Sequence, residues 1–392
     1  MQRLFLPVGQ GAFYCEKFSE EDFCGKVNVV YDCGTISGLS VLKSVIERTF
    51  EHGEVIDALF LSHLHEDHIN GLPILAKRCN VKRVYLPMVD TTDLALMHLA
   101  YTLRRHPKPL PYENIEYENI EEEYTVSERF VLDALQNPVE AIRRYADAYV
   151  VALPVDRADD LLGDVHGVAN DIFGERVGIG TSGRWIYMPF NIRNDEESDK
   201  VRRRFVGQFG KEPSSQNVAE VIADIGGNRV GKKALSEIRD MYKGIRDGLN
   251  ANSMTLYSGL DNLGLAQAID SSISEDVRLK HGVPCSTAAG CLYTGDYIAS
   301  KDRCYWKQLK TAYGRYWGNI GCVQIPHHGS GVNFNDEFLT MSAYNVISAG
   351  FGNMYHHPSN AVLTKYWVRH KFPFVVTQSQ ASGFSTVITT GK

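Results

Sequence analysis

The sequence predicts an α/β protein in which two β-sheets are covered by helices and which carries inserted helical segments. Residues 26–71 read as a strand, an amphipathic helix, a second strand and then a histidine-rich loop. Later in the chain, three short apolar runs typical of buried strands also end in histidine or aspartate. Four strand ends with similar polar side chains indicate one cleft between the two sheets.

The first ninety residues supply the elements of the α/β unit. Residues 2–7 and 12–15 alternate enough to form two short strands around a glycine turn. The segment 37–53 has apolar residues at 39, 42, 46 and 50 and ends in glycine, which predicts an amphipathic helix. The other elements predicted here are strands at 27–31, 58–61 and 81–86 and a short helix near 72–78.

Two segments do not fit this pattern and are predicted to be helical insertions, at about 90–182 and 191–250. Residues 94–106 and 127–149 read as helices within the first insertion. In the second insertion, residues 201–250 contain ten Lys and Arg against six Asp and Glu. This excess is typical either of a surface that contacts phosphate groups or of an ordinary solvated helical face.

The histidine-rich loop concentrates metal-binding side chains. His63, His65, Asp67 and His68 fall within six residues directly after an apolar strand. Side chains alternate along a strand, so His63 and His65 can bind one ion while the two residues beyond the turn face another. The alternative is a solvent-exposed histidine-rich loop without a ligand.

The three later strand ends carry the remaining candidates. Asp296 follows the apolar run at 291–293, and His327 and His328 follow the run at 323–325. A third strand leads through a glycine-rich turn to His357. These side chains are expected to meet the first loop in the same cleft.

These motifs resemble the metallo-β-lactamase superfamily of hydrolases, and in particular the soluble hydrolase domain of ComEC-type competence proteins. The residues that carry the resemblance are VGQG at 8–11, Asp-x-Gly at 32–34, HxHxDH at 63–68, Gly-Asp at 295–296, HHGS at 327–330 and His-Pro at 357–358. The resemblance implies a metallo-β-lactamase-like αββα sandwich, with residues 1–392 forming a single domain around the helical insertions.

The resemblance also implies two divalent ions, Zn²⁺ or Mn²⁺. It assigns His63 and His65 to one ion and Asp67, His68 and His357 to the other, with Asp296 bridging both ions. A carboxylate suits the bridge because it has two oxygens. His357 is chosen over His356 because it stands directly before Pro358, as in the family's Gly-His-Pro. No further histidine can be assigned to complete the first site.

Other residues are expected to support the ligands or to act on the substrate. Asp32 is expected to orient a ligand from beneath the site, and Ser330 and Asn252 are further supporting candidates. Asp67 and one of His327 and His328 are the catalytic candidates. A histidine there can bind a substrate phosphate or protonate the leaving group near neutral pH.

The favoured function is a metal-dependent phosphodiesterase, a nuclease that hydrolyses DNA. The alternatives are a hydrolase of small phosphoesters, such as a cyclic nucleotide or a phosphocholine-like ester, and a metal-retaining binding module. The inserted helices could recruit a protein partner or a second copy of the chain. Fold resemblance alone does not fix the substrate.

Composition limits the other classes. A net charge of −6 excludes an overall basic protein of the histone kind. No run approaches 18 apolar residues, and the start lacks the long apolar core of a signal peptide. The eight cysteines never fall as CxxC. A cytoplasmic protein without a membrane span is therefore expected.

Overall fold

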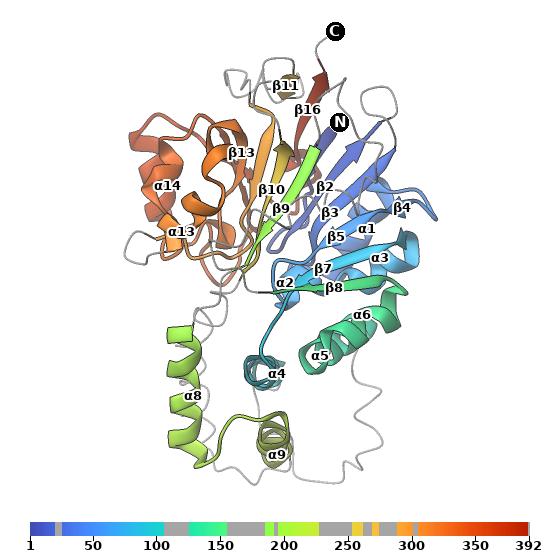
Figure 1. The fold of residues 1–392 in the computed structure, drawn as a ribbon, viewed down its shortest axis with the longest axis vertical. Coiled ribbons are helices and arrows are strands. Elements are labelled where there is room, and N and C mark those ends of the chain that lie inside the picture. Colours follow the sequence, from blue (N-terminus) through green and yellow to red (C-terminus); the bar gives the residue numbers. More distant parts are fainter. Residues whose placement is uncertain are drawn as a thin grey trace.

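A computed structural model describes residues 1–19, 26–105, 125–154, 185–191, 195–226, 253–261, 269–273, 288–300 and 305–390. Two large β-sheets pack face to face, and helices cover their outer faces (Figure 1). Both sheets contribute side chains to the hydrophobic core between them, including Tyr14, Tyr31 and Tyr293. This helix–sheet–sheet–helix arrangement is the α/β sandwich that the sequence predicts.

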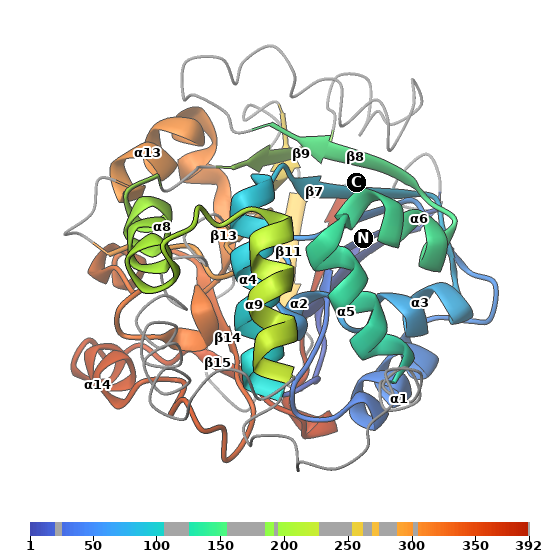
Figure 2. The same cartoon turned by 90° about the horizontal axis from the view of Figure 1, so that it is seen from below.

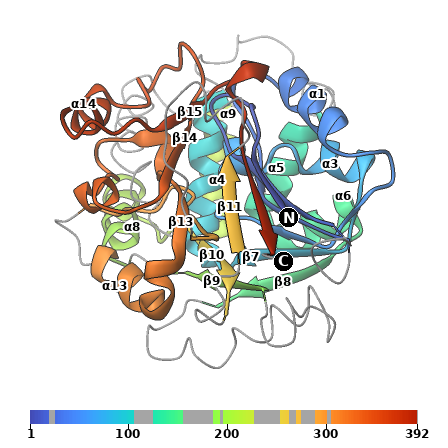
Figure 3. The same ribbon diagram turned by 90° about the horizontal axis from the view of Figure 1, so that it is seen from above.

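The first sheet has eight strands and joins the two ends of the chain. Gln2 of β1 lies opposite Val387 of β16 in an antiparallel pair. Figure 3 shows the C-terminal strand, drawn in red, beside the blue N-terminal strands. This pairing supports the proposal that the chain forms one domain. In sheet order, the strands are β11 (Ile269–Ile273), β16 (Phe384–Thr390), β1 (Gln2–Phe5), β2 (Phe13–Phe18), β3 (Val27–Cys33), β5 (Ala58–Phe60), β7 (Arg83–Pro87) and β8 (Tyr149–Leu153).

The second sheet has six strands, and a separate two-stranded sheet lies beside the first. The four strands from β15 to β12 are parallel, so their carboxyl ends meet at one edge. In sheet order, the strands are β15 (Phe374–Val376), β14 (Tyr344–Ser348), β13 (Ile320–Gln324), β12 (Gly290–Tyr293), β10 (Thr255–Leu260) and β9 (Trp185–Phe190), and the small sheet pairs β4 (Val55–Ile56) with β6 (Asn80–Val81).

Helices with one apolar face cover the sheets. In α1, Leu42, Val45 and Ile46 are buried at the spacing of a single helix face. The helices are α1 (Leu39–Thr49), α2 (Glu66–Ile69), α3 (Leu72–Arg78), α4 (Thr91–Arg105), α5 (Val126–Gln136), α6 (Pro138–Ala146), α8 (Asp195–Phe209), α9 (Ser215–Gly226), α13 (Tyr305–Ala312) and α14 (Asn360–Val368). Short 3₁₀ turns occupy η5 (Gly314–Asn319), η6 (His327–Gly329), η7 (Asp336–Leu339) and η8 (Gln380–Ser382). No helix in the described ranges is long and apolar enough to cross a membrane.

The segment 90–182 differs from the predicted all-helical insertion in two ways. Strand β8 lies inside it, yet pairs in parallel with β7 and extends the first sheet. Its apolar, β-branched residues favour a strand. They directly follow a segment with helical periodicity, so the sequence did not separate this strand from the helix before it. The helix predicted over 127–149 is two helices, because Asn137 caps α6 and Pro138 occupies its first turn.

Helices from both predicted insertions pack together. α4 and α9 lie side by side beyond the ends of the sheets (Figures 1 and 2). Arg202 of α8 donates to Asp90 at 3.0 Å and to the buried Asp93 at 3.2 Å. Arg202 therefore joins α8 to α4, so only Arg203 and Arg204 of the arginine run remain exposed for a phosphate contact.

A buried polar network connects the two sheets. Arg3 Nε of β1 lies 2.7 Å from Glu16 Oε1 of β2, and both side chains are buried. Across the core, three hydroxyl groups of the second sheet donate to the same carboxylate: Tyr187 at 2.6 Å, Ser258 at 2.6 Å and Tyr293 at 3.0 Å. Nothing in the sequence pattern pointed to this network.

Candidate metal centre

The polar cluster lies where the carboxyl ends of strands from both sheets meet. His63 follows β5 of the first sheet after Leu61 and Ser62. From the second sheet, Asp296 follows β12, and His327 and His328 follow β13. Because parallel strands end at the same edge, these short loops face one another across the cleft.

Close backbone packing fixes the first loop. A side-chain carbon on Gly34 would lie 2.5 Å from the backbone carbonyl carbon of Asp67 and 2.5 Å from the amide nitrogen of His68. Only glycine fits there. Helix α2 carries Asp67 and His68, and Ala12 donates its amide to the carbonyl of Asp67 at 3.1 Å. The Asp-x-Gly segment therefore supports the loop that holds two candidate ligands.

One group of potential ligands comprises His63, His65 and Asp296. Their ligand atoms all lie within 4.8 Å of one another. His63 Nε2 is 3.7 Å from Asp296 Oδ2, and His327 Nε2 is 3.6 Å from the same oxygen. The sequence assigned no third histidine to the site of His63 and His65, and His327 lies close enough to Asp296 to be a candidate for it.

The second group comprises Asp67, His68 and His328, with ligand atoms again within 4.8 Å. His328 Nε2 lies 3.3 Å from Asp67 Oδ2. The other oxygen of Asp296, Oδ1, lies 3.3 Å from His68 Nε2 and 3.9 Å from His328 Nε2. The two oxygens of Asp296 therefore face different groups.

Hydrogen bonds behind the imidazoles turn their Nε2 atoms toward the cleft. His68 Nδ1 lies 2.8 Å from Asp32 Oδ2, and the same carboxylate accepts from the amide of Ser62 at 2.7 Å. His328 Nδ1 donates to the carbonyl of Ser348 at 2.8 Å. A carbonyl only accepts, so this bond places a proton on Nδ1, and in the neutral imidazole Nε2 then carries the lone pair. His328 is thereby prepared to bind a metal.

The loop around Asp296 is held in the same manner. The amide of Asp296 donates to Ser253 Oγ at 2.9 Å, and this oxygen also lies 3.3 Å from His63 Nδ1. His327 Nδ1 lies 3.1 Å from Asn333 Oδ1. Ser62 and Ser253 are sequence neighbours of the candidates His63 and Asn252, whereas no sequence feature pointed to Asn333.

The electrostatics of the cluster suit a bound cation. Burial disfavours ionisation of Asp296, but His327 and His68 outweigh it and hold its pKa well below the usual range. Burial lowers the pKa of His65 to about 4, so this imidazole is neutral at neutral pH. In the described part of the chain, the buried Nε2 atoms of His63 and His328 form no hydrogen bond. Burial lowers the pKa of His68 and His328, but the neighbouring carboxylates outweigh it and hold both pKa values above the usual value. Ionised carboxylates and imidazoles that exchange a proton for a metal are the ligands that zinc and manganese take, so the residues fit divalent ions.

His357 lies in a different place from the one expected. Neither ligand group contains it. Its ring is 5.4 Å from that of His327 and stacks on Tyr355 at 6.1 Å between centroids. His356 is exposed. The sequence placed His357 with Asp67 and His68, whereas in the structure His328 lies beside these two residues.

The backbone after β13 turns sharply at the two histidines. His327 and His328 have φ angles of 48° and 54°. In this left-handed conformation the chain turns tightly and the alternation of a strand no longer applies. The amide of Ser330 donates to the carbonyl of His327 at 2.8 Å and closes the turn. Asn252 lies outside the described residues.

A cavity of about 620 Å³ opens beside the cluster. Its walls include Glu66 and Asn70, which flank the ligand loop, and Asn353 and Tyr355 of the loop that carries His357. Arg104 of α4 also lines it and pairs with Glu66. One of the helices from the predicted insertions therefore contributes to the surroundings of the site.

Comparisons with known proteins agree with this geometry. Residues 25–142 match the model of the metallo-beta-lactamase superfamily. Ribonuclease J of Mycoplasma genitalium is 31% identical over 67 residues, and ribonuclease J of Mycoplasma pneumoniae is 33% identical over 67 residues. In each case the match covers 16% of this chain and only 12% of the relative. None of these matches concerns ComEC-type proteins, so that branch stays a prediction. The match over residues 25–142 shows that this part of the chain is similar to the metallo-beta-lactamase superfamily, and the sandwich fold and the ligand cluster agree with that similarity.

Proposed function

We propose that the chain is a metal-dependent phosphodiesterase that acts as a nuclease. The observation that carries the proposal is the position of Asp296, whose two oxygens face two separate groups of ligands. His63, His65 and His327 would hold one divalent ion, and Asp67, His68 and His328 the other, with Asp296 shared. When bound, such ions would supply Lewis acidity to a phosphodiester and lower the pKa of a water molecule.

The chain's own residues would orient the ligand atoms and the substrate and would transfer protons. The bonds from Asp32, Ser348 and Asn333 fix the rings of three histidines, so the ligand atoms need not reorganise on binding. His357 lies beside His327 but outside both groups. We assign it the role that the sequence gave to His327 or His328, which is to bind a phosphate oxygen or to protonate the leaving group.

Two similarities to known proteins bear on the class of the substrate. The sequence resemblance favours DNA, whereas the similarity to ribonuclease J favours RNA. A second candidate is hydrolysis of a small phosphoester. The cavity of about 620 Å³ beside the site supports it, because this volume is typical of pockets for small ligands.

The direct test measures hydrolysis of bis(p-nitrophenyl) phosphate, plasmid DNA, linear DNA and RNA, each with zinc and with manganese. We expect turnover of the diester and of at least one nucleic acid, loss with a chelator and recovery when the metal is restored. Cleavage of the chromogenic diester and of a cyclic nucleotide, with no cleavage of any polymer, would favour the small-molecule enzyme. No metal-dependent diester hydrolysis at all would refute the proposal.

A pair of variants separates ligand from substrate contact. His328→Ala should lower both the metal content and the rate, because it removes an imidazole whose Nε2 lies 3.3 Å from Asp67 Oδ2 and 3.9 Å from Asp296 Oδ1. His357→Ala should keep the metal and lose about 10²- to 10⁴-fold in rate, the usual contribution of a general acid or base. Elemental analysis after gel filtration and diester turnover measure the two effects.

The exposed neighbour His356 supplies the matched control. His356→Ala should change neither metal content nor rate. If His357→Ala lost metal while His328→Ala retained it, the assignment from the geometry would be reversed and the original expectation from the sequence restored.

A further inference from the structure

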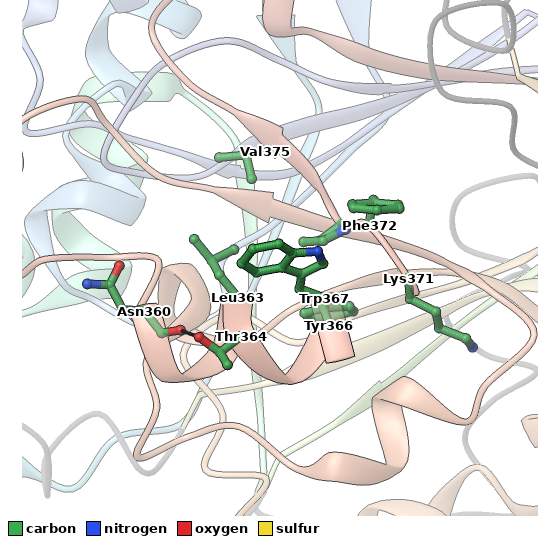
Figure 4. A pocket seen from close by; sticks show the side chains of 9 residues that line it. Asn360, Leu363, Thr364, Tyr366, Trp367, Lys371, Phe372 and Val375 are labelled. Carbon is green, nitrogen blue, oxygen red and sulfur yellow. Dashed lines mark hydrogen bonds between the residues drawn. The ribbon is translucent and has the colours of Figure 1, made fainter. Parts of the chain in front are cut away.

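An exposed aromatic groove lies on the second sheet's helical layer, on α14 and the segment that follows it. The side chains of Trp367 and Phe372 are 72% and 66% exposed, and Val368 between them is 72% exposed. Figure 4 shows the indole of Trp367 between Leu363 and Phe372 in a groove of about 430 Å³. Large apolar side chains gathered on a surface usually mark a binding site.

Cationic residues alternate with these aromatic residues. Lys365, Arg369 and Lys371 lie within seven residues of one another, and the chain has no Asp or Glu from 338 to 392. This is unusual in a chain whose net charge is −6. The nearest acidic residues in the sequence are already paired, since Asp336 accepts from Lys365 at 2.7 Å and Glu337 from Lys310 at 2.9 Å. Because Asp336 offsets Lys365, Arg369 and Lys371 are the cations that remain next to the groove, and they suit an anionic ligand.

The groove is connected to the candidate metal centre through the start of α14. The amide of Ser359 donates to the carbonyl of Gly329, in the turn that carries His327 and His328, at 3.0 Å. Trp367 lies seven residues beyond Asn360, which corresponds to about 10 Å along an α-helix. At about 3.4 Å per nucleotide in a B-form strand, roughly three nucleotides would bridge that length.

We propose that this groove binds single-stranded nucleic acid, with bases stacked on Trp367 and Phe372 and phosphates near Arg369. The inference rests on the proposed nuclease function and specifies the form of its substrate. Aromatic side chains flanked by cations are the usual platform for single strands, because every base has a face that can stack. Two copies of the same positive surface would repel each other, which disfavours a dimer contact.

The binding test uses the metal-loaded protein and a 12-nucleotide single-stranded phosphorothioate oligonucleotide that resists cleavage. Stacking is worth about 1–3 kcal/mol per base, so Trp367→Ala should weaken the affinity by roughly five- to 150-fold. Trp367→Phe should recover most of it. Arg369→Glu should weaken binding and reduce its salt dependence. Fluorescence anisotropy of the labelled strand reports the affinity.

Two controls match these changes in residue type and exposure. Tyr149→Ala removes an aromatic side chain that is 66% exposed on β8, at the edge of the other sheet. Lys43→Glu reverses an exposed charge on α1. Both should bind the oligonucleotide as the wild type does. Trp367 also supplies a signal of its own, because it is the exposed one of the four tryptophans: Trp185 and Trp306 are only 1% and 6% exposed, and Trp317 is half-buried. The strand should therefore quench tryptophan emission in the wild type much more than in Trp367→Phe.

Measuring bis(p-nitrophenyl) phosphate turnover on the same variants separates this inference from the proposed function. Equal oligonucleotide affinity in wild type and Trp367→Ala, with diester hydrolysis intact, would overturn the groove while leaving the enzyme in place. Tryptophan-dependent binding without any diester hydrolysis would support the groove and refute the enzyme. A dimer that Trp367→Ala dissociates, with no effect on the oligonucleotide, would identify a self-association surface and overturn the inference.

Discussion

Asp296→Ala should lower diester hydrolysis by more than about a thousandfold, because the Lewis acidity of a bound ion is worth several kcal/mol in the transition state. Asp296 is the side chain whose separate oxygens lie near His63 and His327 on one side and His68 and His328 on the other. Its removal takes one ligand from each group at once. The remaining histidines would then face each other without the negative charge that offsets a divalent ion.

The measurements are metal content per chain and turnover of bis(p-nitrophenyl) phosphate. The wild type should hold two ions, and Asp296→Ala fewer, with unchanged circular dichroism. Asp296→Asn keeps the shape but loses the charge and one ligand oxygen, so it should resemble the alanine variant. Two tightly held ions and normal turnover in Asp296→Asn would show that Asp296 does not join the two groups.

The contiguous part of the site could be predicted from the sequence because its geometry is local. His63, His65, Asp67 and His68 fall on a strand end and one helical turn, so their spacing alone brings them together. The location of Asp296 at the end of β12 was predictable for the same reason. Apolar runs such as Val27–Cys33 also identified their strands correctly, because burial on both faces leaves a continuous hydrophobic signal.

The positions of His328 and His357 relative to the two ligand groups could not be predicted, because they depend on backbone torsion. A positive φ at a non-glycine residue has no sequence signature in HHGS, yet it decides which ring enters the cleft. Contacts between segments that are distant in the sequence could not be predicted either. His327 meets Asn333, and Asp296 meets Ser253, only after both sheets have formed.

The buried network around Glu16 is the clearest example of structure that the sequence conceals. In β2 a glutamate between Cys15 and Lys17 reads as a solvent-facing residue, but its side chain lies between the sheets. Its partners come from β1, β9, β10 and β12 and lie up to 277 residues from Glu16 in the sequence. No local pattern could bring them together in advance.

Glu16→Ala should reduce the free energy of unfolding by about 3–5 kcal/mol, because it leaves the buried Arg3 guanidinium without its carboxylate. Three hydroxyl donors, from Tyr187, Ser258 and Tyr293, would lose their acceptor as well. Denaturant unfolding followed by circular dichroism measures the effect. Glu47→Ala is the matched control, since Glu47 is exposed and its pair with Lys43 spans 3.9 Å, which should cost less than about 0.5 kcal/mol.

Glu16→Gln then distinguishes charge from hydrogen bonding. The amide keeps one oxygen to accept from the hydroxyl groups, but it cannot neutralise Arg3, so its loss of stability should lie between those of the control and of Glu16→Ala. The diesterase rate of whatever fraction remains folded should be unchanged, because the network contacts neither ligand group. A Glu16→Ala protein as stable as the Glu47→Ala control would mean that the apolar packing between the sheets, and not this ion pair, holds the sandwich together.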